Sequence, residues 1–342
     1  MSNIKKINNL ESIRKVLVIQ FRPFGDVFIS SVIFETLKKK MPEAELHYLV
    51  FHPYQVTVLE HPFIDHVIPF KIEKGLKYYI SRLILWKKIA GYKFDLVIDL
   101  QNNPGSQLIT FFSGAKYRLG YQHGQFSFMY NYRSQEGGAR YSASLRFDIL
   151  KPLNIKEEKW RFYYFVTNDS IQYINQWLQN IGLYHHEFVV MSPGSPMDWK
   201  KWSLEYYAQL ADMIVDQLQL PIILLWAKNE KEDCLRIANL MKNKSYLAID
   251  TSLNQAAALL QKTKLLICND GGINHISCAT ETTTIAIMKV YMVKNWSPAP
   301  FFSHHHHVVN EKYVFTKGDH TFGVSPKMVF QKICEVLANG KA

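Results

Sequence analysis

The sequence predicts an α/β protein with two doubly wound, Rossmann-like domains facing a cleft. Short apolar runs rich in β-branched residues, such as KVLVIQ at 15–20 and PIILLW at 221–226, are typical of buried parallel strands. Segments with helical periodicity separate these runs, and the alternation starts again in the second half. A chain of 342 residues, 48% of them hydrophobic, is long enough for two such cores.

Strands and helices are expected to alternate in both halves. The first half should contain strands 15–20, 45–51, 94–100 and 161–166, with helices 27–40, 76–91 and about 141–150. The second half should contain strands 188–192, 221–226, 246–250, 264–270 and 283–288, with helices 170–181, 203–218, 230–242 and 253–261. Residues 121–145 are otherwise expected to be loop. Asp169 and Ser252 are predicted helix caps, the latter in a capping box with Gln255, and Gly182 should end a helix.

The predicted domains are 1–168 and 169–342. A final helix over about 325–338 is expected either to stay on the second sheet or to pack back on the first domain. Ligands of open α/β sheets bind beyond the carboxyl ends of the strands. Functional residues should therefore directly follow strands.

Composition narrows the class of protein. The net charge of +11 suits an anionic partner: nucleic acid, a phosphorylated substrate or an anionic membrane surface. Without a signal-like apolar core or a run of about 18 apolar residues, a cytoplasmic protein is expected. The four cysteines are scattered and form no C-x-x-C pair, so we expect reduced thiols rather than a zinc site or disulfides.

The first candidate site is FRPFGDV, residues 21–27, directly after the first strand. It has too few glycines for a dinucleotide fingerprint. Gly25 would allow close approach or a positive φ, and Arg22 would lie on the same loop. Asp26 is either a helix N-cap or a general base that takes a proton from a substrate hydroxyl.

The second candidate site is SPGSPMDWKKWS, residues 192–203. Small residues and prolines predict a turn with exposed amides, Ser195 offers a hydroxyl, and Lys200 lies just before a helix. These groups suit a phosphate. The structural alternative is a pair of solvated lysines between two packing tryptophans.

The third candidate site is CNDGGINH, residues 268–275. Gly271 and Gly272 leave backbone amides beside a helix start, which favours an anion nest. His275 would donate to phosphate oxygens. Asp270 would repel a phosphate, so we expect it to hold the loop by accepting amide hydrogen bonds.

Two further features have competing interpretations. Glu230 and Glu232 follow the strand 221–226 and are either ribose-binding acids or first-turn acids favoured by the helix dipole. The HHHH tract at 304–307 is interpreted as incidental surface histidines, since adjacent residues of a strand point to opposite faces and converge poorly on one ion.

The ordered set of motifs resembles the lipopolysaccharide heptosyltransferases, inverting glycosyltransferases of the GT-B fold. The resemblance rests on FGDV after the first strand, KKW after a Pro-Gly turn and NDGGINH entering a helix. Lesser matches are HPFIDHVIPF, FDLVIDLQNN, SGAKYRLGY and TSLNQAAALLQKTKLLICND. It covers about residues 15–310.

The resemblance implies an acceptor glycolipid on the first domain, ADP-heptose on the second, and no metal ion or other cofactor. Asp26 matches the family's catalytic Asp, and Lys200 matches the lysine on the donor phosphates, with Ser195 in the same loop. Asp270, Gly271, Gly272 and His275 match the phosphate loop. Departures lie in the donor half: Ala227 and Gly271 replace the usual Gly and Ser or Thr, and MKVYMVKNWSPAP at 288–300 replaces a Gly-Pro-Thr-like segment.

The basic helix 76–90 interleaves lysines with apolar residues, so it either rests on the inner face of the cytoplasmic membrane or packs into the core with solvated lysines. Other functions remain open at this point. One is a UDP-sugar transferase or epimerase of the same fold. Another is a non-catalytic nucleotide- or RNA-binding protein, although no RNA-recognition signature is present and no nucleic-acid partner is expected.

Overall fold

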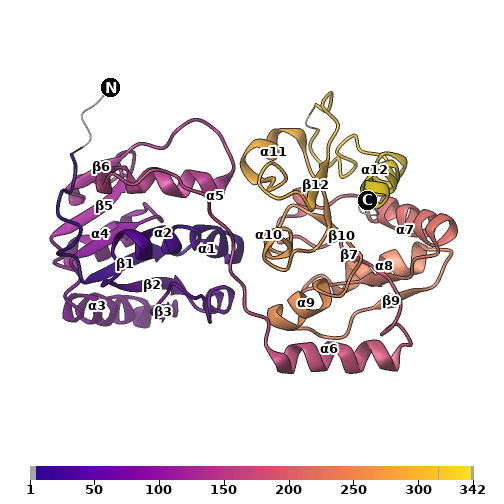
Figure 1. Cartoon of the computed structure of the whole chain (residues 1–342), viewed down its shortest axis with the longest axis horizontal. Coiled ribbons are helices and arrows are strands. Elements are labelled where there is room, and N and C mark those ends of the chain that lie inside the picture. Colours follow the sequence, from indigo (N-terminus) through magenta and orange to yellow (C-terminus); the bar gives the residue numbers. More distant parts are fainter. Residues whose placement is uncertain (1–4, 315, 340–342) are drawn as a thin grey trace. The chain divides into compact units, whose positions relative to one another are not determined.

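The protein consists of two compact α/β units in a computed structural model that describes residues 5–314 and 316–339. The chain divides between Phe165 and Val166, close to the predicted boundary at 168. Each unit is built on one six-stranded sheet in which all neighbouring strands are parallel (Figure 1). The predicted α/β class with two doubly wound domains is confirmed.

The first sheet has the order β3-β2-β1-β4-β5-β6 and the second β12-β11-β10-β7-β8-β9. Counted from the first strand of each unit, both are the 3-2-1-4-5-6 order of dinucleotide-binding folds. The strands are β1 Lys15–Gln20, β2 Glu45–Phe51, β3 His66–Phe70, β4 Leu96–Asp99, β5 Tyr117–Tyr121 and β6 Tyr132–Ser134 in the first unit. The second has β7 Val189–Ser192, β8 Ile222–Leu224, β9 Ser245–Leu247, β10 Leu265–Asn269, β11 Thr284–Ile287 and β12 His305–Val308.

Helices connect successive strands. The first unit contains α1 Phe24–Ser30, α2 Ile33–Lys40, α3 Leu76–Gly91, α4 Pro104–Phe112 and α5 Ser142–Leu145, with 3-10 turns at Tyr54–Thr57, Ser127–Met129 and Arg146–Leu153. The second contains α6 Asn168–Asn180, α7 Leu204–Leu218, α8 Lys231–Leu240, α9 Leu253–Leu260, α10 Gly272–Ala279, α11 Val290–Trp296 and α12 Pro326–Asn339, with a 3-10 turn at Asp198–Lys200.

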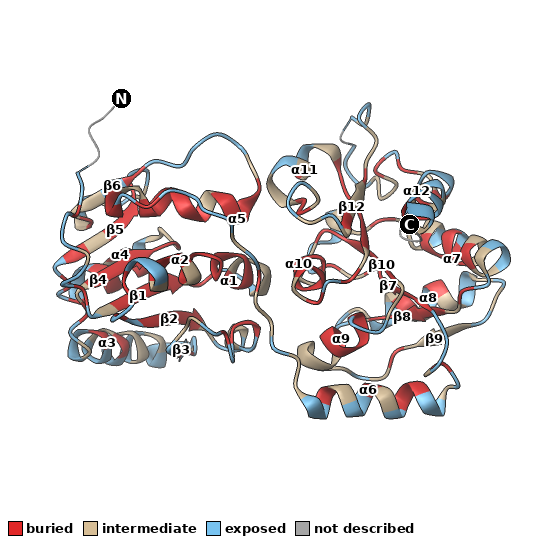
Figure 2. Ribbon diagram, viewed as in Figure 1, coloured by how far each residue is buried: buried red, intermediate tan, exposed pale blue. Residues whose placement is uncertain are grey.

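The central strands carry the cores. β1, β4, β7 and β10 are almost entirely buried, as their continuous apolar runs predict (Figure 2). In the second unit α7, α8 and α12 cover one face of the sheet through a single apolar cluster that includes Trp202 and Tyr207. The last helix, α12, thus packs on α7, β11 and β12 of its own unit.

The predicted helix 27–40 is two helices. Ser31 ends α1 because both its amide and its hydroxyl bond to the Phe28 carbonyl, at 3.1 and 2.8 Å. Such side-chain bonding competes with the helical ladder. The predicted strand 161–166 is wrong: its rings pack instead, with Phe162 stacked on Phe28 at 4.9 Å between centroids.

The predicted caps are partly right. Ser252 and Gln255 form the capping box of α9, and Gly182, with φ of +75°, follows the end of α6. Thr167, rather than Asp169, is the N-cap of α6, because its hydroxyl accepts a hydrogen bond from the Ser170 amide. The region 121–145 contains the short strand β6, which was not predicted because its three residues have no strand-like alternation of apolar and polar side chains.

The interpretation of HHHH as surface histidines is wrong for His305. The tract forms most of the strand β12, and His305 is buried with Nε2 3.1 Å from the Asn274 carbonyl. Burial lowers the pKa of His305 to about 3, against the opposing effect of that hydrogen bond.

Buried neutral imidazoles predict a stability that falls on acidification. Burial lowers the pKa of His61 to about 4 and of His275 and His305 to about 3. Below the unfolded value of about 6.5 the unfolded chain binds protons that the folded chain refuses, so stability decreases as pH falls from about 6.5 towards 4. Burial raises the pKa of Asp99 to about 6, so this carboxyl gains stability from protonation over the same pH range. It offsets the effect of one of the three histidines, and the net stability still falls.

Urea unfolding between pH 7 and 4 measures this effect. The His305→Gln variant keeps an amide donor near the Asn274 carbonyl and should flatten the dependence by up to about 1.4 kcal/mol per pH unit. An unchanged pH dependence in this variant would contradict a neutral, buried His305.

Candidate active site

In each unit the strand order reverses between the first and fourth strands, and the predicted site residues follow those strands, except Glu230 and Glu232, which follow β8. In the first unit the loops after β1 and β4 are joined, because the Phe21 amide donates to Gln101 Oε1 at 3.0 Å. Asp99 builds the second loop by accepting hydrogen bonds from the amides of Gln101 and Asn102, both at 3.0 Å. Tyr130 donates to its other oxygen at 2.7 Å.

Asp26 lies in the first turn of α1, and the structure excludes it as the N-cap, which is Pro23. Its Oδ1 accepts a hydrogen bond from Arg146 Nη2 at 2.7 Å, and Arg22 Nη1 lies 3.8 Å from the same atom. Both contacts reach Oδ1, and neither of them reaches Oδ2. Gly25 is helical, so of its two expected uses, close approach or a positive φ, the positive φ is excluded.

Arg146 is a functional candidate that the sequence interpretation missed. It begins the 3-10 turn Arg146–Leu153, is 5% exposed, and its Nε is buried without a hydrogen-bond partner in the described chain. Its charge reaches the buried phenols of Tyr48 and Tyr121, where it opposes the rise in pKa that burial causes. Arg146 therefore fixes the Asp26 carboxylate from a buried position.

In the second unit the loops after β7 and β10 meet through Lys200 and Asp270. Lys200 Nζ lies 2.7 Å from Asp270 Oδ2, and the two side chains are 19% and 4% exposed. The ammonium also lies over the rings of Trp199 and Trp296, at 5.5 and 5.2 Å from their centroids. Asp270 thus holds the lysine, a contact that the sequence interpretation did not include.

Asn269, the last residue of β10, fixes the loop that carries Lys200. Its Nδ2 donates to the Pro193 carbonyl, and its Oδ1 accepts from the Trp202 amide and the Tyr207 hydroxyl, both at 3.1 Å. In the same loop Ser195 is buried and its Oγ accepts a hydrogen bond from the Met197 amide at 3.3 Å. Trp202 is a core residue, as the structural alternative predicted.

The Asp-Gly-Gly turn does not depend on left-handed backbone. Gly271 is the extended N-cap of α10, with φ of −172°, and Gly272 is the first helical residue. A Cβ at Gly271 would meet no atom within 4 Å, so the helix start is open there. An anion can therefore bind to the free backbone N–H groups in the first turn of α10, without a nest of left-handed residues.

His275 is buried in α10 beside Trp296, at 6.3 Å between ring centroids. Burial, with a smaller effect of the Lys200 charge, lowers its pKa to about 3. His275 is therefore a neutral imidazole at physiological pH and supplies no positive charge to a phosphate.

The two glutamates separate. Glu230 is the N-cap of α8, its Oε2 accepts from the Ala227 amide at 3.1 Å, and burial raises its pKa. Its carboxylate lies against Gly194, where a Cβ would come within 1.9 Å of Glu230 Oε2. Glu232 is an exposed first-turn acid of α8, and no described contact joins it to this site.

The segment 288–300 contributes residues that the motifs did not reveal. It forms α11, whose N-cap is the almost fully buried Lys289 and whose last residue is Trp296. Lys289 Nζ lies 5.6 Å from the Trp199 centroid and 4.8 Å from that of Phe322, and burial lowers its pKa. Two lysines thus flank Trp199.

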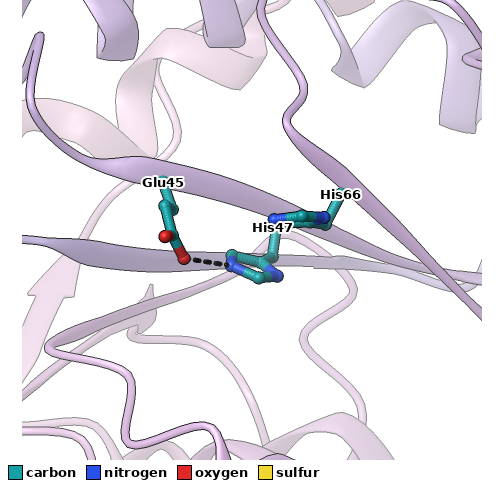
Figure 3. Close-up of side chains that lie close together, drawn as sticks. All are labelled: Glu45, His47 and His66. Atoms are coloured by element: carbon teal, nitrogen blue, oxygen red, sulfur yellow. Dashed lines mark hydrogen bonds and ion pairs between the residues drawn. The ribbon is translucent and has the colours of Figure 1, made fainter.

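A cluster of residues that could bind a metal ion lies away from these loops. Glu45, His47 and His66 lie at the amino ends of β2 and β3, the opposite edge of the sheet from Asp26, and form the one such group among the described residues (Figure 3). Glu45 Oε2 is 3.4 Å from His47 Nε2 and 3.7 Å from Lys15 Nζ. The lysine already balances the carboxylate, which makes this cluster a poor cation site.

Loss of the Asn269 contacts should release the Lys200 loop. Asn269→Ala leaves the Pro193 carbonyl, the Trp202 amide and the Tyr207 hydroxyl without their partner, at about 1–3 kcal/mol for each buried group. Urea unfolding should show a loss of at least about 3 kcal/mol. Tyr207→Phe removes one of these bonds and is the matched control, with a loss of about 1 kcal/mol. Equal losses of stability in the two variants would contradict the role of Asn269 in fixing the loop.

Comparison with known proteins places the chain in a family. Residues 82–311 match the model of glycosyltransferase family 9 (heptosyltransferase). The lipopolysaccharide core heptosyltransferase OpsX of Haemophilus influenzae is 22% identical over 285 residues, covering 81% of this chain and 79% of its own.

Two solved structures share the fold. The glycosyl transferase family 9 protein from Veillonella parvula superposes with a TM-score of 0.80 and 20% identity, covering 97% of this chain and 99% of its own. The E. coli heptosyltransferase WaaC with ADP-2-deoxy-2-fluoro heptose superposes with a TM-score of 0.71 and 19% identity, covering 94% of this chain and 99% of its own. The fold is the GT-B fold of these enzymes, and the chain belongs to glycosyltransferase family 9, the heptosyltransferases.

Proposed function

We propose that this glycosyltransferase moves a heptose from ADP-heptose to an inner-core sugar of lipopolysaccharide, with inversion and without a metal ion. The observation that carries the donor half is the Lys200–Asp270 pair at the open start of α10. The names of the relatives, which include a lipopolysaccharide core heptosyltransferase, support the choice of substrates.

Asp26 is the proposed general base. Arg146 holds Oδ1, so Oδ2 is positioned to take the proton of an acceptor hydroxyl. The hydroxyl oxygen then attacks the anomeric carbon from the face opposite the leaving group. The carbon passes through an oxocarbenium-like state, as in inverting sugar hydrolysis, and its bond to the phosphate oxygen breaks.

The electron pair of that bond remains on the departing diphosphate. Lys200 and the α10 amides are placed to stabilise this charge, and Lys289 adds a second ammonium beside Trp199. These fixed charges would take the part that a metal ion plays in other transferases. Glu230, held beside Gly194, is the better of the two glutamates for accepting ribose hydroxyls.

The acceptor side suits an anionic glycolipid. Arg22, whose side chain is about half exposed, lies 3.8 Å from Asp26 Oδ1 and offers a guanidinium to an acceptor carboxylate or phosphate. Since such acceptors are anchored in a bilayer, we also propose a cytoplasmic enzyme in peripheral contact with the inner membrane surface, and no nucleic-acid partner.

Removing the base should abolish chemistry but not donor binding. Asp26→Asn keeps the shape of the side chain and should lower turnover of ADP-heptose with a lipid acceptor by about 10²–10⁴-fold. The affinity for ADP should remain within about twofold, because Asp26 contributes nothing to the donor site. Glu43→Gln, an exposed acid of the same unit, is the control. Unchanged turnover in Asp26→Asn would rule out this base.

Neutralising Lys200 should weaken donor binding. Lys200→Gln retains a hydrogen-bond donor towards Asp270 but loses the charge, and calorimetry should show ADP binding weakened by about 10–100-fold. Lys201→Gln is the matched control, because that neighbouring ammonium pairs with Asp233 at 2.7 Å. Equal effects of the two substitutions would mean that ADP senses only the general positive charge.

A further inference from the structure

Helix α3 carries an apolar stripe that faces solvent. Leu76, Tyr79, Ile80, Leu83 and Ile84 are 76%, 66%, 48%, 59% and 61% exposed. Figure 2 shows exposed and intermediate residues along most of this helix, in contrast to the buried strands beside it. An apolar row of this size on a globular protein marks a binding surface.

The stripe is separate from the side of α3 that packs on the sheet. Leu85 and Ile89 are its buried residues, and they join the core cluster formed by β1–β4. At about 100° per residue, the five exposed apolar side chains span about 140° and lie roughly opposite Leu85. The helix is therefore apolar on two faces, and packing on the sheet uses one of them.

Positive charge borders the stripe. Between His66 and Phe94 the sequence holds seven basic residues and one acid. The basic residues are Lys71, Lys74, Lys77, Arg82, Lys87, Lys88 and Lys93. The acid, Glu73, already pairs with Lys71 at 3.4 Å, and Lys77, Lys87 and Lys88 are exposed on α3 itself.

The apolar surface continues onto α4. Phe112 stacks on Trp86 of α3 with 4.9 Å between centroids, and Phe111 and Phe112 are both about half exposed. Two adjacent helices thus offer aromatic and aliphatic side chains with lysines at the border. No described helix is long and apolar enough to cross a membrane. An exposed apolar row bordered by lysines suits insertion into an anionic membrane surface.

We propose that α3 docks this protein on an anionic phospholipid surface, with Leu76, Ile80 and Leu83 inserted among the acyl chains and the lysines on the headgroups. A second copy is a poorer occupant, because a two-fold interface would bring the same lysines face to face. The proposed function explains why a bilayer should be the partner, since its acceptor is a lipid. The binding itself requires no donor or acceptor.

Flotation with vesicles tests the proposal on the full-length protein. The wild type should bind vesicles of phosphatidylcholine with 30% phosphatidylglycerol and should bind pure phosphatidylcholine far more weakly. Leu76→Ser/Ile80→Ser/Leu83→Ser should lower the partition coefficient at least about tenfold. Lys77→Gln/Lys87→Gln should lower it by about fivefold for each lysine at low salt.

The matched control removes three exposed apolar side chains of α6, α8 and α12: Tyr173→Ser/Leu240→Ser/Met328→Ser. It should bind vesicles like the wild type, and equal thermal stability of the two triple variants verifies folding. No binding of the wild type to anionic vesicles, or equal loss in both triple variants, overturns the proposal. The proposal is also overturned if the wild type is a dimer in sedimentation equilibrium and the α3 triple variant is a monomer whose vesicle binding is unchanged. Because no nucleotide sugar is present, failure here leaves the transferase reaction untouched.

Discussion

Both units depend on one property of parallel sheets: where the strand order reverses, the connections from two adjacent strands diverge and leave their carboxyl ends uncovered. The reversal lies between β1 and β4 in the first unit and between β7 and β10 in the second. Asp26 follows β1, whereas Lys200 and Asp270 follow β7 and β10. The same strand order, used twice, therefore presents a carboxylate in one unit and an ammonium with an open helix start in the other.

Buried polar residues hold these groups in place. Asn269 fixes the loop of Lys200 with three hydrogen bonds, and Asp99 organises the loop after β4. Such buried polar groups are costly to leave unsatisfied, so each loop has one favoured conformation.

Much of the fold could be predicted from the sequence because central strands are continuous apolar runs and strong caps mark the helices. Short or mixed segments such as β6 and α11 carry no such pattern. Helix α4 was missed although Asn103 and Pro104 form a capping signal that could have revealed it.

The candidate site was predicted where a residue lies in the segment after a strand, as with Asp26, Lys200 and Asp270. Arg146 lies 120 positions from Asp26, so local pattern gives no sign of their contact. Lys289 and Trp296 come from a segment that departs from the family pattern, and only the folded chain brings Trp296 to Lys200 and Lys289 to Trp199. The burial of His275 and His305 likewise depends on the tertiary structure, and with it the neutral state of His275.

If protein groups alone bind the donor diphosphate, the affinity for the nucleotide does not depend on a divalent cation. Calorimetric titration of the wild type with ADP and with UDP, each in EDTA and in excess Mg²⁺, measures this dependence. We expect ADP to bind with equal affinity in both buffers and UDP to bind more weakly. Binding that requires Mg²⁺ would contradict the role given to Lys200 and Lys289, and preference for UDP would contradict ADP-heptose as the donor.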